Sequence, residues 1–147
     1  MKALVIFDSN FGNTKIIAET ISKGFGKDVK VLSVSDFNIK ELEGIELLVV
    51  GSPIIAWRPS EKMGKFLAGL SSGQLKGLKA ATFDTRVKLF ISGDASKKIA
   101  KELKKAGAEI IVEPQAFLVK GKEGPLFDGE VGKAAEWATS IKTLFKD

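Results

Sequence analysis

The chain has 147 residues, 44% hydrophobic and 28% charged, with a formal net charge of +5, which suits one compact domain over residues 1–147 with a buried core. Cysteine and histidine are both absent. Their absence excludes disulfides, thiolate nucleophiles, imidazole bases and the usual zinc and haem ligands, so we expect no metal site and no catalytic residue.

Taken in order, the chain alternates strands with amphipathic helices. Apolar runs predict strands at 3–7, 29–34, 47–50, 80–83 and 108–112. The first, third and fourth runs are continuous, as in a parallel sheet that helices cover on both faces, whereas 29–34 alternates like an edge strand. The run at 3–7 is too short for a signal peptide or a membrane span, which indicates a cytoplasmic protein without a membrane partner.

Four apolar stripes predict helices, and Gly26 and Gly107 are placed to end the first and third of them. The predicted core faces are Ile17, Ile21 and Phe25; Met63, Phe66, Leu67 and Leu70; Ile99, Leu103 and Ala106; and Val131, Ala135, Ala138, Ile141 and Phe145. This alternation predicts an α/β fold with three layers, in which a doubly wound, five-stranded parallel sheet lies between helices.

Two segments, 86–94 and 113–129, do not follow the alternation. We expect 113–129 to be an irregular connection or a short strand pair ending at Asp128, the predicted N-cap of the last helix. The basic run at 95–105 has no interleaved aromatic residues, so a solvated lysine face is favoured over nucleic-acid binding. An acidic partner remains an alternative.

The loop DSNFGNT, residues 8–14, joins the first strand to the first helix. A helix N-terminus offers unpaired N–H groups to an anion, and this loop adds two hydroxyls, two amides and a glycine. A helix cap is the alternative explanation, but a cap needs one such residue. Together with the loops after the third and fourth strands, at the same sheet edge, the pattern favours a phosphate site.

Several phosphate-binding classes are excluded by their motifs. The chain has neither G-x-x-x-x-G-K-[ST] nor a G-x-G-x-x-G after the first strand. A response-regulator receiver would need an aspartate at the end of the third strand, where this chain has Gly51, Ser52 and Pro53.

These loops and the sequence that follows them resemble the short-chain flavodoxin family over essentially the whole chain. The resemblance implies strand order 2-1-3-4-5 and a non-covalently bound flavin mononucleotide (FMN). Its phosphate would be held by Ser9, Asn10, Phe11, Gly12, Asn13 and Thr14. Its ring would be flanked by Ser52, Pro53, Ile54, Ile55, Ala56 and Trp57, and on the second side by Asp84, Thr85 and Arg86.

The chain departs from the family pattern in its aromatic residues and its charge. Tyrosine is absent, so Phe83, Phe90 or the backbone around Thr85 must cover the second face of the ring. Flavodoxins are usually acidic, whereas here Lys15, Arg58, Lys62, Arg86 and Lys88 lie in or beside the loops. Nearby cations favour an anionic reduced flavin, with Arg86 as the strongest candidate, unless these side chains point into water.

The resemblance implies an electron carrier that exchanges electrons with redox proteins, namely a reductase as donor and a separate acceptor. The alternative within the family is a flavin-dependent NAD(P)H quinone or small-molecule reductase. A binding module without flavin is a third class, against which the intact phosphate loop argues. Nucleic-acid binding is not expected, and the protein is predicted to be a monomer or a weak dimer.

Overall fold

The computed structural model describes residues 1–55, 57–88 and 94–145. The strands are β1 (Ala3–Phe7), β2 (Val29–Ser33), β3 (Leu47–Ile55), β4 (Arg58–Pro59), β5 (Lys79–Val87), β6 (Glu109–Ile110) and β7 (Gln115–Val119). The α-helices are α1 (Asn13–Phe25), α2 (Glu61–Ala68), α3 (Ala95–Lys105) and α4 (Glu130–Thr143), with short 3-10 helices η1 (Val34–Asp36) and η2 (Ile39–Leu42).

The sheet has the order β2-β1-β3-β5-β6, with these neighbours parallel, and this confirms the predicted doubly wound topology. The fifth strand position is split between β6 and β7, both of which pair with β5. Between the two pieces the chain has residues 111–114, which include Pro114, a residue that cannot donate to the strand ladder. The predicted strand at 108–112 is therefore shorter than expected, and a further strand follows it.

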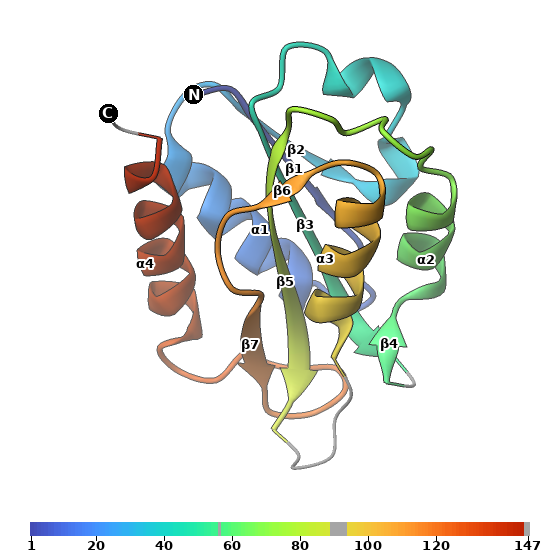
Figure 1. Ribbon diagram of the computed structural model, residues 1–147. Helices are drawn as coiled ribbons and strands as arrows, with labels where there is room; N and C mark the ends of the chain where they lie inside the picture. The colour runs from blue at the N-terminus through green and yellow to red at the C-terminus, as the bar shows by residue number, and fades with distance from the viewer. Residues whose placement is uncertain (56, 89–93, 146–147) are drawn as a thin grey trace.

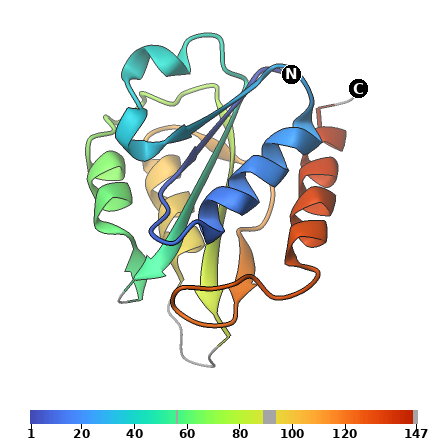
Figure 2. The same ribbon diagram turned by 180° about the vertical axis from the view of Figure 1, so that it is seen from behind.

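Helices cover both faces of the sheet (Figures 1 and 2). On β1 the side chains of Ala3, Val5 and Phe7 join the core cluster under α1 and α4, and the alternate side chains join the cluster under α2 and α3. Within the residues described, no helix has the length and apolar character needed to cross a membrane. The three-layer arrangement predicted from the sequence is confirmed.

The last helix is rotated relative to the predicted stripe. Val131 is 44% exposed and Ala135 is also exposed, so the prediction that they face the core is wrong. Trp137 sets the rotation because it packs edge-to-face against Phe83 and Phe117, at centroid distances of 6.2 and 6.1 Å. Its predicted packing role is confirmed, and the buried face of α4 is Glu130, Ala134, Trp137, Ala138 and Ile141.

The segment 113–129 contains β7 and an antiparallel bridge between Val119 and Leu126. The predicted N-cap at Asp128 is wrong: the cap is Gly129, whose φ of 89° is left-handed, and it makes no side-chain cap bond. Glu130 instead anchors the start of α4 to the sheet, because its carboxylate accepts a 2.6 Å hydrogen bond from Leu118 N.

Gly51 marks the tightest packing on the central strand. A Cβ at this position would lie 2.1 Å from Cζ of Phe83, a fully buried ring. We expect Gly51→Ala to lower the free energy of unfolding by about 1–3 kcal/mol, because the ring must move within a packed core. Urea denaturation followed by circular dichroism measures the change.

Gly64→Ala is the matched control. Gly64 lies within α2 and its added Cβ would meet nothing within 4 Å, so alanine should stabilise the protein by about 0.5–1 kcal/mol. Equal effects of the two substitutions would contradict the packing argument.

Candidate functional site

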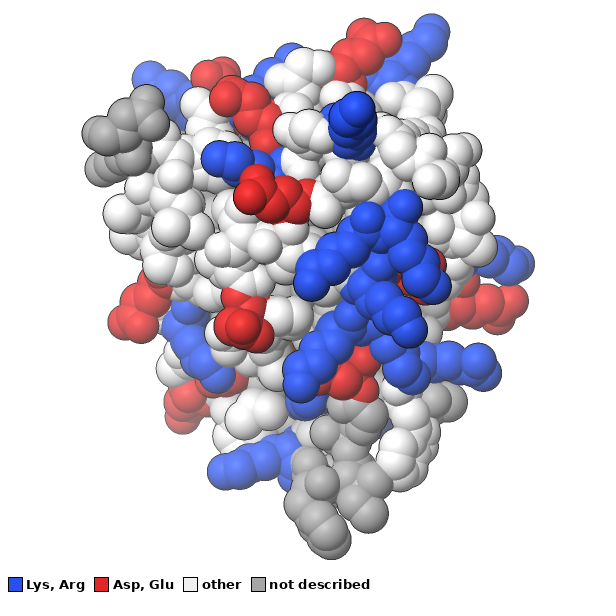
Figure 3. All heavy atoms as spheres, in the orientation of Figure 1, with Lys and Arg blue, Asp and Glu red and all other residues white. Residues whose placement is uncertain are grey.

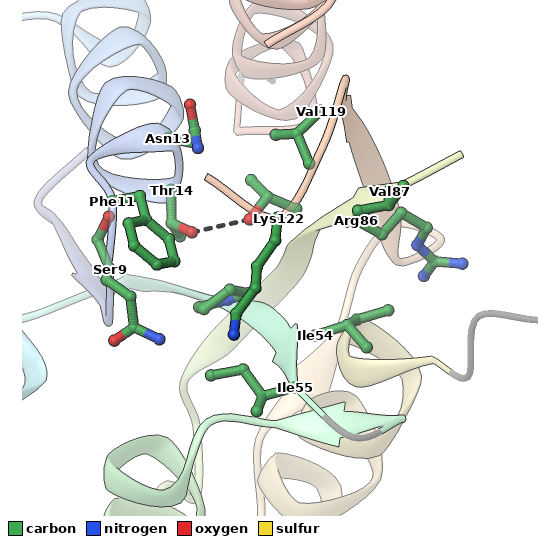
Figure 4. Close-up of a pocket in the computed structure, with 13 residues that line it drawn as sticks. Ser9, Phe11, Asn13, Thr14, Ile54, Ile55, Arg86, Val87, Val119 and Lys122 are labelled. Atoms are coloured by element: carbon green, nitrogen blue, oxygen red, sulfur yellow. Dashed lines mark hydrogen bonds between the residues drawn. The ribbon is translucent and has the colours of Figure 1, made fainter. Parts of the chain in front are cut away.

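A cavity of about 500 Å³ lies at the carboxyl ends of the parallel strands, where ligands bind in open α/β sheets. The structure places ten of the fifteen predicted site residues in its wall: Ser9, Asn10, Phe11, Asn13, Thr14, Pro53, Ile54, Ile55, Thr85 and Arg86. Figure 4 shows their side chains around the cavity, contributed by the loop before α1, by the start of α1 and by the ends of β3 and β5, which extend beyond the predicted strands 47–50 and 80–83. Among the other five, Gly12, Ser52, Trp57 and Asp84 lie outside the wall, and Ala56 lies outside the described residues.

The loop before α1 is held by its own serine. Ser9 Oγ accepts hydrogen bonds from Gly12 N at 3.0 Å and Lys15 N at 3.4 Å. Gly12 is the N-cap of α1 with φ 93°, a conformation that favours glycine, and it offers no side-chain cap. Among the described residues, no side-chain acceptor is recorded for the N–H groups of Asn13 and Thr14, the first two of the helix. They keep their capacity to bind an anion.

Thr14 connects this loop to the end of β5. Its Oγ1 lies 2.8 Å from Oγ1 of Thr85, and both residues are buried. Either hydroxyl can be the donor, which leaves the other with a proton to offer to a ligand. The bond, dashed in Figure 4, fixes two walls of the cavity relative to each other.

Asn13 lies in the cavity wall and also makes a long-range contact that the sequence did not predict. Its side-chain amide donates a 3.2 Å hydrogen bond to the carbonyl of Glu123, in the loop between β7 and α4. It therefore holds the loop that carries Lys122, whose side chain extends across the cavity in Figure 4.

Lys122, Val87 and Val119 line the cavity but were not predicted from the sequence. The topology contained a signal for two of them, since Val119 ends β7, the strand beside β5, and Lys122 follows its carboxyl end. Phe83, a predicted cover for the ring, is instead fully buried in the core, and Phe90 lies outside the described residues.

Ser52 and Trp57 shape the rim of the site. Ser52 is fully buried, and its Oγ accepts a 3.0 Å hydrogen bond from Ser60 N, which ties β3 to the start of α2. Trp57 is 56% exposed and has φ 73°, the only left-handed non-glycine residue in the described part of the chain. The left-handed backbone conformation of Trp57 costs about 1–2 kcal/mol relative to a right-handed or extended one.

Asp84 and Arg86 form a charge pair at the end of β5. The Asp84 carboxylate is fully buried and accepts hydrogen bonds from Arg86 Nε at 2.9 Å, Arg86 Nη2 at 2.6 Å and Ser96 N at 2.9 Å. Arg86 also lies 3.4 Å from Asp94. The hydrogen bonds to Asp84 raise the pKa of Arg86 above its usual value, although burial acts in the opposite direction. Arg86 is thus compensated by two carboxylates.

The donor set fits a phosphate monoester attached to a flat apolar group. Hydroxyl, amide and helix N-terminal N–H groups lie at one end of the cavity, and Lys122 adds a cation. Ile54, Ile55, Val87 and Val119 provide apolar wall for a ring system. Doubly wound sheets with this strand order bind mononucleotides outside the carboxyl ends of their strands. The fold and the cavity therefore place this chain in the class of mononucleotide-binding α/β proteins.

Comparison with known proteins gives the family. The flavodoxin family model matches residues 5–137. A flavodoxin from Clostridium beijerinckii is 34% identical over 84 residues, which cover 54% of this chain and 60% of that protein. A solved flavodoxin from the domain Archaea is 27% identical with a TM-score of 0.78, covering 98% of each chain. Flavodoxin 2 from Bacillus cereus, at 22% identity, aligns with a TM-score of 0.82 over 99% of this chain and 100% of its own.

The chain belongs to the flavodoxin family. The family resemblance seen in the sequence is therefore confirmed, and with it FMN as the cofactor and electron transfer as the class of function.

We expect Asp84→Asn to lower the free energy of unfolding by about 3 kcal/mol, because it leaves the partly buried Arg86 without its main counter-charge. Asp128→Asn is the control, since Asp128 is exposed and forms no ion pair among the described residues. Urea denaturation of both variants checks this, and a loss below about 0.5 kcal/mol for Asp84→Asn would show that the pair contributes little.

Proposed function

We propose that this protein is an electron carrier whose FMN occupies the cavity at the carboxyl ends of the strands, rather than a reductase that turns over a small substrate. The observation that carries the proposal is the wall of that cavity, which combines phosphate donors with an apolar slot. The only titratable side chains in the described wall are Arg86 and Lys122.

At the phosphate end, we assign the binding role to Ser9, Asn10, Phe11, Gly12, Asn13 and Thr14, as predicted. The N–H groups at the start of α1 and the Thr14 hydroxyl would donate to phosphate oxygens. Gly12 provides the turn, and Asn13 would act by holding the loop of Lys122.

At the ring end, we assign some of the predicted residues to contact with the ring and others to positioning the strands that carry them. Pro53, Ile54, Ile55 and Thr85 would contact the ring, while buried Ser52 and Asp84 would position the ends of β3 and β5. Trp57 would flank the ring from the rim, and the assignment of Ala56 to the ring rests on the sequence alone. In the absence of tyrosine, we assign the second face to Val87 and Val119.

The bound flavin supplies acceptance and release of one or two electrons, and the surrounding protein adjusts how readily this happens. The apolar wall would keep water from the ring. Because two carboxylates compensate Arg86, Lys122 is the cation that would stabilise negative charge in the cavity. The sequence had instead suggested Arg86 as the cation that stabilises the negative charge of the reduced flavin.

The carrier proposal also rests on what the chain offers for proton transfer. The sequence has no histidine, cysteine or tyrosine, Arg86 is held by Asp84, and the proposal assigns Lys122 to the flavin itself. A carrier needs no proton donor toward a second substrate, but it needs redox proteins as partners, one as electron donor and one as acceptor.

The absorption spectrum of the purified protein, recorded before and after addition of FMN and removal of the excess, tests the cofactor. We expect flavin bands with quenched fluorescence, and oxidation of NADH or NADPH in the presence of a quinone no faster than with free FMN. A colourless protein would refute the proposal, and rapid NAD(P)H oxidation would make it a reductase.

We expect Lys122→Gln to weaken FMN binding about 5- to 30-fold, because a charge-assisted contact is lost. Fluorescence titration of the apoprotein measures the affinity. Lys120→Gln is the matched control, since Lys120 is an exposed lysine two residues away and outside the cavity wall.

Titration with riboflavin, which lacks the phosphate, shows what Lys122 contacts. Loss of the effect with riboflavin would assign Lys122 to the phosphate, and an equal effect would assign it to the ring. Unchanged FMN affinity of Lys122→Gln would remove this residue from the site.

A further inference from the structure

One face of α3 carries five exposed lysines, Lys97, Lys98, Lys101, Lys104 and Lys105, which we call the lysine array. The opposite face holds Ile99 and Leu103, both fully buried against the sheet, so the helix cannot turn the lysines away from solvent. Between Lys97 and Lys105 the array extends about 12 Å along the helix. In Figure 3 it forms a continuous basic patch at the centre of the face.

The positive charge of the array is largely uncompensated. Lys97 lies 3.7 Å from Asp94 and Lys105 lies 3.3 Å from Glu102, whereas no ion pair of Lys98, Lys101 or Lys104 is recorded among the described residues. Lysines four residues apart on a helix repel each other, at a cost of a few tenths of a kcal/mol per pair. A surface with opposite charge would remove this cost on binding.

The array is connected to the rim of the cavity. Lys98 Nζ donates a 3.0 Å hydrogen bond to the carbonyl of Trp57, and α3 packs beside β4, the strand that follows Trp57. Trp57 and Ile55 are 56% and 41% exposed, and Ile55 also lines the cavity. An exposed tryptophan beside a cluster of cations is the composition of a protein-binding surface, with an apolar anchor and a charged surround.

We propose that the lysine array, together with Trp57, is the docking surface for an electron-transfer protein with an acidic surface. This inference rests on the proposed function and names the chemistry of the partner. A carboxylate-rich surface on the array would place the partner at the cavity rim, where electrons would enter or leave, and long-range attraction would speed the encounter.

The same features argue against other anionic partners. Binding of a nucleic acid strand uses aromatic side chains along a basic groove, but α3 has no aromatic residue, and Trp57 lies at only one end of the array. An anionic membrane would need an extended apolar helix face beside the lysines, but the apolar face of α3 is buried in the core, and the exposed apolar side chains named beside the array are Trp57 and Ile55.

The probe for the test is an acidic [2Fe–2S] ferredoxin, reduced and mixed with the FMN-loaded protein in a stopped-flow instrument. The array variant Lys101→Glu/Lys104→Glu is compared with the control Lys27→Glu/Lys142→Glu, which changes the net charge equally. Lys142 reaches toward Gly26 on the far side of the sheet, where α1 and α4 lie (Figure 2). Lys101→Gln/Lys104→Gln is a milder array variant in case the charge reversal impairs folding.

At an ionic strength of about 20 mM, we expect the array variant to lower the second-order rate constant at least about tenfold. The control should stay within about threefold of wild type, and the glutamine variant should fall between control and array variant. The differences should disappear at about 0.5 M salt, where charges are screened. Amide signals that shift or broaden with oxidised ferredoxin should centre on α3 and the Trp57 indole.

Equal rates of array variant and control would overturn the proposal. It would also be overturned if the wild-type protein bound a DNA duplex or anionic vesicles more tightly than it binds ferredoxin, and if the array variant lost that binding. Photoreduced deazaflavin is a small electron donor that needs no docking surface, so it tests the electron-carrier function separately from the docking proposal. A wild-type protein that keeps FMN and is reduced by deazaflavin retains the proposed function even if the array has no effect.

Discussion

The cavity and the lysine array beside it both depend on the hydrogen bonds and the ion pair of the buried Asp84 carboxylate. A fully buried carboxylate is stable only when its charge is compensated and its oxygens are hydrogen-bonded. Arg86 supplies the charge and two hydrogen bonds, and the N–H of Ser96 supplies a third. Because Ser96 lies in the first turn of α3, this one group fixes the end of β5, the orientation of Arg86 and the start of the helix that carries the lysines.

In this arrangement some charged side chains stabilise the fold, and others remain available to bind a ligand or a partner protein. Arg86 faces two carboxylates, so its charge is used within the protein. Lys122, in contrast, extends into the cavity from a loop held by Asn13, and the lysines of α3 face solvent. A count of basic residues near the loops does not distinguish these cases, because distance to a compensating carboxylate decides whether a cation acts on a ligand or a partner.

The parts of the fold that follow from local pattern were predictable from the sequence. Continuous apolar runs mark strands buried on both faces, and the run at 3–7 is β1 to the residue. Gly26 and Gly107, both with positive φ, end α1 and α3 as predicted. The meeting of the loop before α1 with the ends of β3 and β5 was predictable for a geometric reason, since parallel strands place their carboxyl ends together, although the sequence placed the last two segments in loops.

The parts that depend on distant contacts were not predictable. The face that α4 buries is decided by Trp137 between two phenylalanines, and an apolar stripe that included Val131 could not reveal that contact. The same holds for Lys122, whose place in the cavity depends on a hydrogen bond between Asn13 and the carbonyl of Glu123, 110 residues away in the sequence. The sequence shows Asn13 only in its local setting, in a loop before a helix, and therefore could not reveal this long-range contact. The Nδ2 group of Asn13 carries two N–H donors, so one of them can hold the loop that carries Lys122 while the other stays available to a ligand.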